Sequence, residues 1–167
     1  VRLSRGLGDV YKRQDLNGYL IIENALTKKE LKDLNKILDK LKKLKNNEWA
    51  GYVHGHNYGG KEGLNLQQIY EAGKPFEKLI DHPSWINHML HFVGGKNTFD
   101  QHHGPLFVDE NFANIRGPGE AIGIHSGHHE GLQRNHFRFQ EGKFHCGQVN
   151  ILFCLLYTSP SPRDNRT

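Results

Sequence analysis

The two ends of the chain most constrain what it can fold into, because both read as translations of the same DNA adapter. Residues 154–164 (CLLYTSPSPRD) match one frame of a transposase adapter that is used in sequencing libraries. Residues 4–14 (SRGLGDVYKRQ) match the reverse complement of that adapter in another frame. The outermost residues agree as well, because the codons of residues 165–167 encode Val1-Arg2-Leu3 when the opposite strand is read.

Segments that come from library preparation carry no information about a fold. We therefore expect residues 1–14 and 154–167 to be translated adapter and residues 15–153, 139 in number, to be the natural part of the chain. The two end segments contain six basic and two acidic residues, so they account for the whole formal charge of +4. The natural segment has a net charge of zero, which removes the nucleic-acid-binding function that a basic chain suggests.

The natural segment also lacks any apolar run near the ~20 residues of a membrane-spanning helix. It contains one cysteine, Cys146, so it cannot form an internal disulfide framework. The favoured role for Cys146 is that of a buried, unreactive thiol. We expect a chain that binds neither nucleic acid nor membrane and that is located in the cytoplasm.

The first half of the natural segment is predicted to be mainly helical. Thr27 and Glu30 match a capping box, and leucines and isoleucines at helical spacing follow, so we expect a helix from Lys28 to about Lys45. A strand is expected at Gly18–Ile22 before this helix, and loop-like sequence at Asn46–Gly63 after it. A further strand at Asn65–Tyr70 and two short helices within Pro75–Phe92, broken at Pro83, complete this half.

From Thr98 the pattern changes to short β-like runs that are separated by Gly, Pro and Asn. Arg116-Gly117-Pro118-Gly119 is a strong turn signal within them. Such spacing is typical of a sandwich or barrel, so the chain is expected to be mixed α/β (α+β), with helices first and strands second. The expected strands are Leu106–Val108, Phe112–Arg116, Ala121–His125, His136–Phe139 and Phe144–Phe153.

Seven of the twelve histidines lie between Gln101 and Cys146. Imidazole is the commonest metal ligand in proteins, and two histidines with one carboxylate are the ligand set of non-haem Fe(II) oxygenases. His125 is the strongest candidate, because it ends an expected strand and enters the loop Ser126–Glu130. The pairs His102-His103 and His54/His56 are assigned surface or hydrogen-bonding roles.

Several segments, in this order, resemble the phytanoyl-CoA dioxygenase family. The opening of that family is similar to residues 18–24 (GYLIIEN) and 26–31 (LTKKEL), and the core of a bacterial branch is similar to residues 107–113 (FVDENFA), 115–119 (IRGPG), 124–127 (IHSG) and 144–150 (FHCGQVN). The likeness spans essentially all 139 natural residues, and its specificity comes from the order and spacing of the segments together.

The resemblance implies that residues 15–153 are part of a double-stranded β-helix, a jelly-roll or cupin-like core with N-terminal helices. It implies Fe(II) and 2-oxoglutarate as cofactors, O2 as co-substrate, and hydroxylation of a small-molecule substrate. By position, His125 corresponds to the first histidine ligand of the family. The strand from Gln148 through Asn150 to Leu152 would line the co-substrate pocket, with Asn114 and Arg116 as neighbours.

The chain departs from the family pattern at Gly127, which occupies the position of the aspartate ligand. Either His128 or Glu130 replaces that ligand, or the coordination position is open, as in related His-x-Gly halogenases. The distal histidine and the arginine for 2-oxoglutarate lie beyond residue 153 in the family. We therefore expect a domain that is truncated before its last strands, active in its natural parent and inactive as this chain.

Two further functions remain open from the sequence. The same scaffold with Gly127 fits a halogenase, which chloride-dependent product formation would distinguish. A non-catalytic β-barrel binding module that has lost its metal site is the alternative from another class, and the absence of the distal histidine from the missing segment would favour it. A surface-binding role for the lysine-rich helix loses its basis once the net charge is zero.

Overall fold

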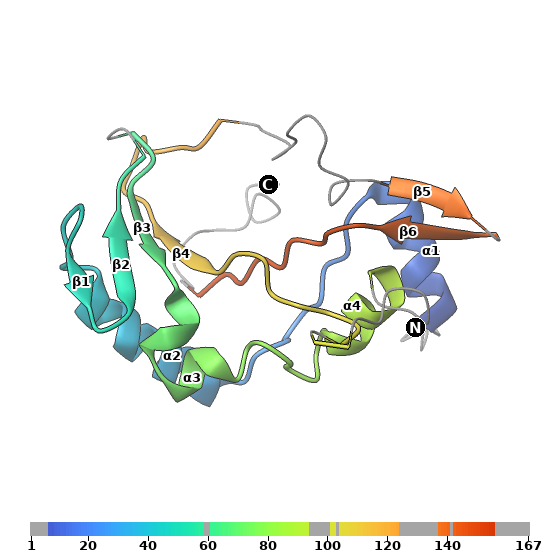
Figure 1. Ribbon diagram of the computed structural model, residues 1–167, viewed down its shortest axis with the longest axis horizontal. Helices are drawn as coiled ribbons and strands as arrows, with labels where there is room; N and C mark the ends of the chain where they lie inside the picture. The colour runs from blue at the N-terminus through green and yellow to red at the C-terminus, as the bar shows by residue number, and fades with distance from the viewer. Residues whose placement is uncertain are drawn as a thin grey trace, which may run out of the picture.

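A computed structural model describes residues 7–58, 61–93, 101–102, 104–123, 137–140 and 142–155. Within these ranges, helices and antiparallel strands together form a mixed α/β structure (Figure 1). The helices are α1 (Leu7–Asn17), α2 (Lys28–Leu41), the 3-10 helix η1 (Ile69–Ala72), α3 (Lys74–Glu77) and α4 (Ile86–Phe92). The strands are β1 (Trp49–Ala50), β2 (Val53–His56), β3 (Leu64–Gln67), β4 (Phe112–Ile115), β5 (Phe137–Gln140) and β6 (Lys143–Cys146).

Helix α2 begins where the sequence predicts, because the capping box is formed. The backbone N–H of Glu30 donates to the Thr27 hydroxyl at 3.2 Å, and the Thr27 N–H donates to the Glu30 carboxylate at 2.7 Å. The helix ends at Leu41, earlier than the expected Lys45. The chain beyond it turns away because the N–H of Asn47 donates to the Gly55 carbonyl and the Gly55 N–H donates to the Glu48 carbonyl.

The principal sheet contains four antiparallel strands in the order β1-β2-β3-β4. Strands β1 and β2 form a hairpin with a two-residue turn, in which Gly51 has a φ of 63°. Glycine tolerates this left-handed conformation without steric cost. The expectation of a loop is therefore wrong for residues 49–56, which the turn and the pairing with β3 order into a hairpin, whereas residues 46–48, 57–58 and 61–63 lie outside strands as expected.

The hydrophobic core lies between one face of this sheet and the helices α2 and α3 (Figure 1). Val53 of β2 and Leu66 of β3 are almost completely buried there, against Leu34 of α2 and Phe76 of α3. The buried set is completed by Leu41, Ile69, Leu79 and Trp85. Phe153 and Leu155 also pack against this core, and the Leu155 carbonyl accepts a hydrogen bond from the Asn35 amide at 2.7 Å.

Two other expected strands are not formed. Residues 19–22 are irregular, with Tyr19 and Ile21 exposed, so the expectation of a strand at Gly18–Ile22 is wrong. Leu106–Val108 is likewise irregular. Both runs have β-favouring residues, but β-propensity depends on a neighbouring strand and neither run pairs with one in the described structure. The helix break at Pro83 is confirmed by the separation of α3 from α4.

Strands β5 and β6 form a separate two-stranded hairpin beside α1 and α4, away from the principal sheet (Figure 1). Strand β6 ends at Cys146, whereas the sequence predicted extended structure to Phe153. The end of the expected strand Ala121–His125 lies outside the described residues, and residues 121–123 are irregular. None of the helices described is long and apolar enough to cross a lipid bilayer.

Candidate functional site

The face of the principal sheet that lies opposite the core carries two rows of side chains across the strands. Residues that pair directly on neighbouring strands point to the same face. One row runs His56, Asn65, Asn114. The second row runs Trp49, His54, Gln67, Phe112. We call this surface the polar sheet face, and its residues alternate with the buried Val53, Gly55 and Leu66 on the same strands.

Asn65 is the most deeply placed polar residue of this face, with an exposed fraction of 6%. Its Nδ2 donates a hydrogen bond to Oδ1 of Asn114 at 2.8 Å. Its own Oδ1 is buried and accepts no hydrogen bond from the described residues. A buried acceptor without a partner costs about 1–3 kcal/mol, so this oxygen is a position where a bound water or ligand donor would stabilise the protein.

Aromatic rings flank both histidines of the polar sheet face. The rings of Trp49 and His54 are stacked, with centroids 4.4 Å apart and planes inclined by 23°. The rings of His56 and Tyr58 meet edge to face at 4.3 Å. The hydroxyl of Tyr58 accepts a hydrogen bond from Nε2 of Gln67 at 2.5 Å. These contacts restrict the imidazole rings on a surface that is otherwise open to solvent.

The structure places the residues expected to bind the co-substrate in two separate locations. Asn114 lies on the polar sheet face and is exposed. Arg116 follows the end of β4, where its Nε donates to the Glu62 carbonyl at 3.2 Å. The expected turn after it is formed, with the Gly117 N–H donating to the Glu120 carboxylate.

Gln148 and Asn150 lie on the irregular segment after β6. Gln148 donates through Nε2 to the Asp109 carboxylate at 3.3 Å, and Asn150 is exposed. The strand expected to present these two side chains to a pocket is absent, which corrects the expectation that β structure extends through them.

The expected metal ligands His125, His128 and Glu130 lie outside the described residues, as does Gly127. Within the ranges that the structure does describe, no group of three or more His, Cys, Asp or Glu side chains is arranged to hold a metal ion. His54 and His56 lie next to each other on β2, with ring centroids 5.8 Å apart.

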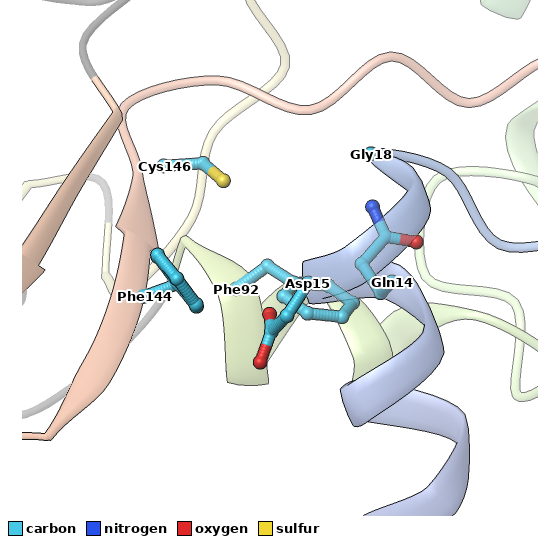
Figure 2. A pocket seen from close by; sticks show the side chains of 6 residues that line it. All are labelled: Gln14, Asp15, Gly18, Phe92, Phe144 and Cys146. Carbon is cyan, nitrogen blue, oxygen red and sulfur yellow. The ribbon is translucent and has the colours of Figure 1, made fainter.

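A cleft of about 300 Å³ lies at the other end of the molecule, between α1, α4 and β6 (Figure 2). Its lining residues are Gln14, Asp15, Gly18, Phe92, Phe144 and Cys146. Burial raises the pKa of the Cys146 thiol, and the nearby Asp15 carboxylate acts in the same direction. A thiol of raised pKa is a poor nucleophile, which agrees with the unreactive role expected for Cys146. One wall of the cleft comes from α1, most of which belongs to the segment predicted to be adapter.

The same helix covers two histidines of α4. Tyr11 stacks on His91 with ring centroids 3.6 Å apart and meets His88 edge to face. Burial lowers the pKa of both imidazoles below its ordinary value and so favours their neutral form. Tyr11 lies in residues 1–14, the segment predicted to be adapter, so on that prediction this arrangement is no part of the natural protein.

No family model, no curated protein and no solved structure matches the chain. The polar sheet face is therefore defined by its geometry alone. From the sequence, His54 and His56 are expected in a loop and Asn65 carries no expected role. The available signal was the alternation Val53-His54-Gly55-His56, which places two imidazoles on one side of a short strand.

Proposed function

We propose that residues 15–153 are part of an Fe(II)- and 2-oxoglutarate-dependent oxygenase of the phytanoyl-CoA dioxygenase type, which hydroxylates a small organic substrate. The proposal rests on the ordered motifs of the sequence, from residues 18–24 to residues 144–150. The structural observation that favours it is an antiparallel sheet with one face packed on helices and the other face lined by His56, Asn65 and Asn114. A double-stranded β-helix requires such a sheet as one of its walls, with the polar side toward the ligand.

The described residues suit the co-substrate in part. The exposed Asn114 amide and the Arg116 guanidinium are donors that can bind a carboxylate. They lie two positions apart at the end of β4. Bound iron would supply the oxidative chemistry, while the protein would bind and orient the co-substrate and exclude water. The jelly-roll core and the ligand set around His125 are parts of this proposal.

The first test is to read the codons that follow Phe153 in the source gene. The proposal expects continuing strands that contain a histidine and, further on, an arginine. The extended protein, supplied with Fe(II), should convert 2-oxoglutarate to succinate in an O2-dependent manner. His125→Ala should lower the rate at least about a hundredfold, because a ligand of the metal is removed.

His102→Ala is the matched control and should retain the rate of the extended protein. Succinate formation that is no greater than in a metal-free blank would contradict the proposal and favour a non-catalytic binding module. Succinate formation that survives in His125→Ala would contradict the assignment of His125 as a metal ligand. The 167-residue chain itself is expected to form no succinate, and turnover by it would refute the expected inactivity.

A halogenase on the same scaffold is the second candidate, and Gly127 at the position of the aspartate ligand favours it. The extended protein would then give a chlorinated product only when chloride is present. Gly127→Asp should convert chlorination into hydroxylation, because the carboxylate would occupy the position that chloride needs. A hydroxylated product from the unchanged extended protein, independent of chloride, would instead assign the hydroxylase.

A further inference from the structure

We propose that His54 and His56 form a second metal site, a bidentate site for a divalent transition metal ion such as Cu²⁺, Ni²⁺ or Zn²⁺. The two residues are two positions apart on β2, so both imidazoles project from the polar sheet face. This site is separate from the iron site proposed around His125, and it stands whether or not the oxygenase function is correct.

The separation of the two rings is compatible with one shared ion. A metal bound about 2.1 Å from an imidazole nitrogen lies about 3.2 Å from the ring centroid, so two rings have centroids about 5.3 Å apart on a tetrahedral ion and about 4.6 Å apart as adjacent ligands of a tetragonal ion such as Cu²⁺. The observed centroid separation is 5.8 Å, so the two rings have to approach each other by about 0.5–1.2 Å to share an ion, which small side-chain rotations permit. Stacking on Trp49 and the edge contact with Tyr58 hold the two rings near this separation before a metal arrives. Less side-chain entropy is then lost on binding.

Asn65 provides a second and independent observation. It pairs directly with His56 across β2 and β3, and its buried Oδ1 has no donor among the described residues. Metal-bound histidines usually donate their second ring N–H to a carboxylate or carbonyl oxygen, which fixes the tautomer and raises the basicity of the ligand. The unpartnered Asn65 oxygen is an acceptor of this kind on the residue that pairs with His56.

The side chains of the polar sheet face favour a transition metal ion over Mg²⁺ or Ca²⁺. Two imidazoles favour borderline transition metals, whereas Mg²⁺ and Ca²⁺ prefer oxygen ligands. None of the seven residues in the two rows is a lysine or arginine that would repel a cation. We expect affinity to follow the order Cu²⁺, then Ni²⁺ and Zn²⁺, with water completing the coordination.

The fluorescence of Trp49 reports on this site. The chain has two tryptophans: Trp49 is 60% exposed and stacked on His54, whereas Trp85 is 2% exposed in the core. Titration of the 167-residue chain with Cu²⁺ should quench the emission in a saturable manner, and Trp49→Phe should abolish most of the change. His54→Ala and His56→Ala should each raise the half-saturating concentration at least about tenfold, and Asn65→Ala by a smaller factor.

His102→Ala is the matched control and should leave the Trp49 titration unchanged. The thermal unfolding midpoint of each variant shows that it is folded. As a second measurement, Cu²⁺ should broaden the backbone amide resonances of residues 53–56 in the unchanged chain but not in the double variant H54A/H56A. Linear, non-saturating quenching, equal quenching by Mg²⁺, or an unchanged titration in the double variant would overturn the proposal.

Discussion

The two faces of the four-stranded sheet are built from the same strands and have opposite roles. On one face, Val53 and Leu66 are sealed against α2 and α3. On the other, His54, His56 and Asn114 are partly or fully open to solvent. The contrast shows how alternation along a short strand divides its side chains, because each strand contributes one set to the core and places the other set on the opposite face.

The largest effect is expected from a substitution on the core face. Leu66→Ala removes a side chain that is fully buried between the sheet and the helices, so we expect the free energy of unfolding to fall by about 2–5 kcal/mol. Urea denaturation followed by circular dichroism measures this loss. Gln67→Ala, one residue along and on the other face, should change stability by less than about 0.5 kcal/mol. Equal losses in the two variants would show that the faces do not differ as described.

Gly55 tests the closeness of the core face to the segment that follows α2. A Cβ at this position would lie 2.6 Å from the Lys45 carbonyl oxygen and 3.3 Å from Cβ of Leu44. The backbone cannot easily yield there, because Gly55 is hydrogen-bonded to Asn47 and Glu48. Gly55→Ala should therefore cost about 1–3 kcal/mol through overpacking. Gly123→Ala is the control, since its added Cβ would meet nothing within 4 Å, and thermal unfolding compares the two.

A smaller effect is expected within the polar sheet face. Asn114→Ala removes the acceptor for Nδ2 of Asn65, which is left buried and unpartnered. We expect a loss of about 1–2 kcal/mol. A double-mutant cycle with Asn65→Ala isolates the pair, because the double variant should lose less than the sum of the two single variants. Strict additivity would mean that the Asn65–Asn114 hydrogen bond contributes nothing to stability.

The smallest effect concerns the N-terminus of α2, and it depends on pH. Hydrogen bonds from the Thr27 side chain, and then from its backbone, lower the pKa of Glu30 from 4.5 to about 2. The folded state therefore binds this proton more weakly than the unfolded state does. The resulting stability is present above pH 4.5 and is lost as the pH falls toward 2.

Unfolding free energies measured between pH 2 and pH 6 test this expectation. Glu30→Gln keeps an acceptor for the cap but cannot titrate, so its stability should fall less steeply with acid than that of the unchanged chain. Asp33→Asn is the matched control, since Asp33 is only paired with Lys29 on the helix surface, and surface pairs of this kind contribute little. Parallel pH profiles for the unchanged chain and Glu30→Gln would contradict the role of Glu30.

Sequence reasoning was most successful where the signal is local. The capping box places the start of α2, proline separates α3 from α4, and the Arg116–Gly119 turn follows β4 as expected. It failed where pairing decides the conformation: Gly18–Ile22 favours β structure but has no neighbouring strand, whereas Val53–His56 has a weak pattern and is ordered by β1 and β3. Of the expected site residues, Asn114 lies on the polar sheet face. Its hydrogen bond with Asn65 and the aromatic contacts of His54 and His56 on the same face were not predicted.

The sequence by itself determined the neutral charge of residues 15–153, the expected adapter origin of both ends, and the local signals that begin and end helices. These depend on composition or on residues a few positions apart. Only the tertiary structure decided that His56, Asn65 and Asn114 form one row, or that Gly55 lies against the segment that follows α2. The physical reason is that strand alternation specifies which side chains share a face, whereas register and packing join residues far apart in the chain.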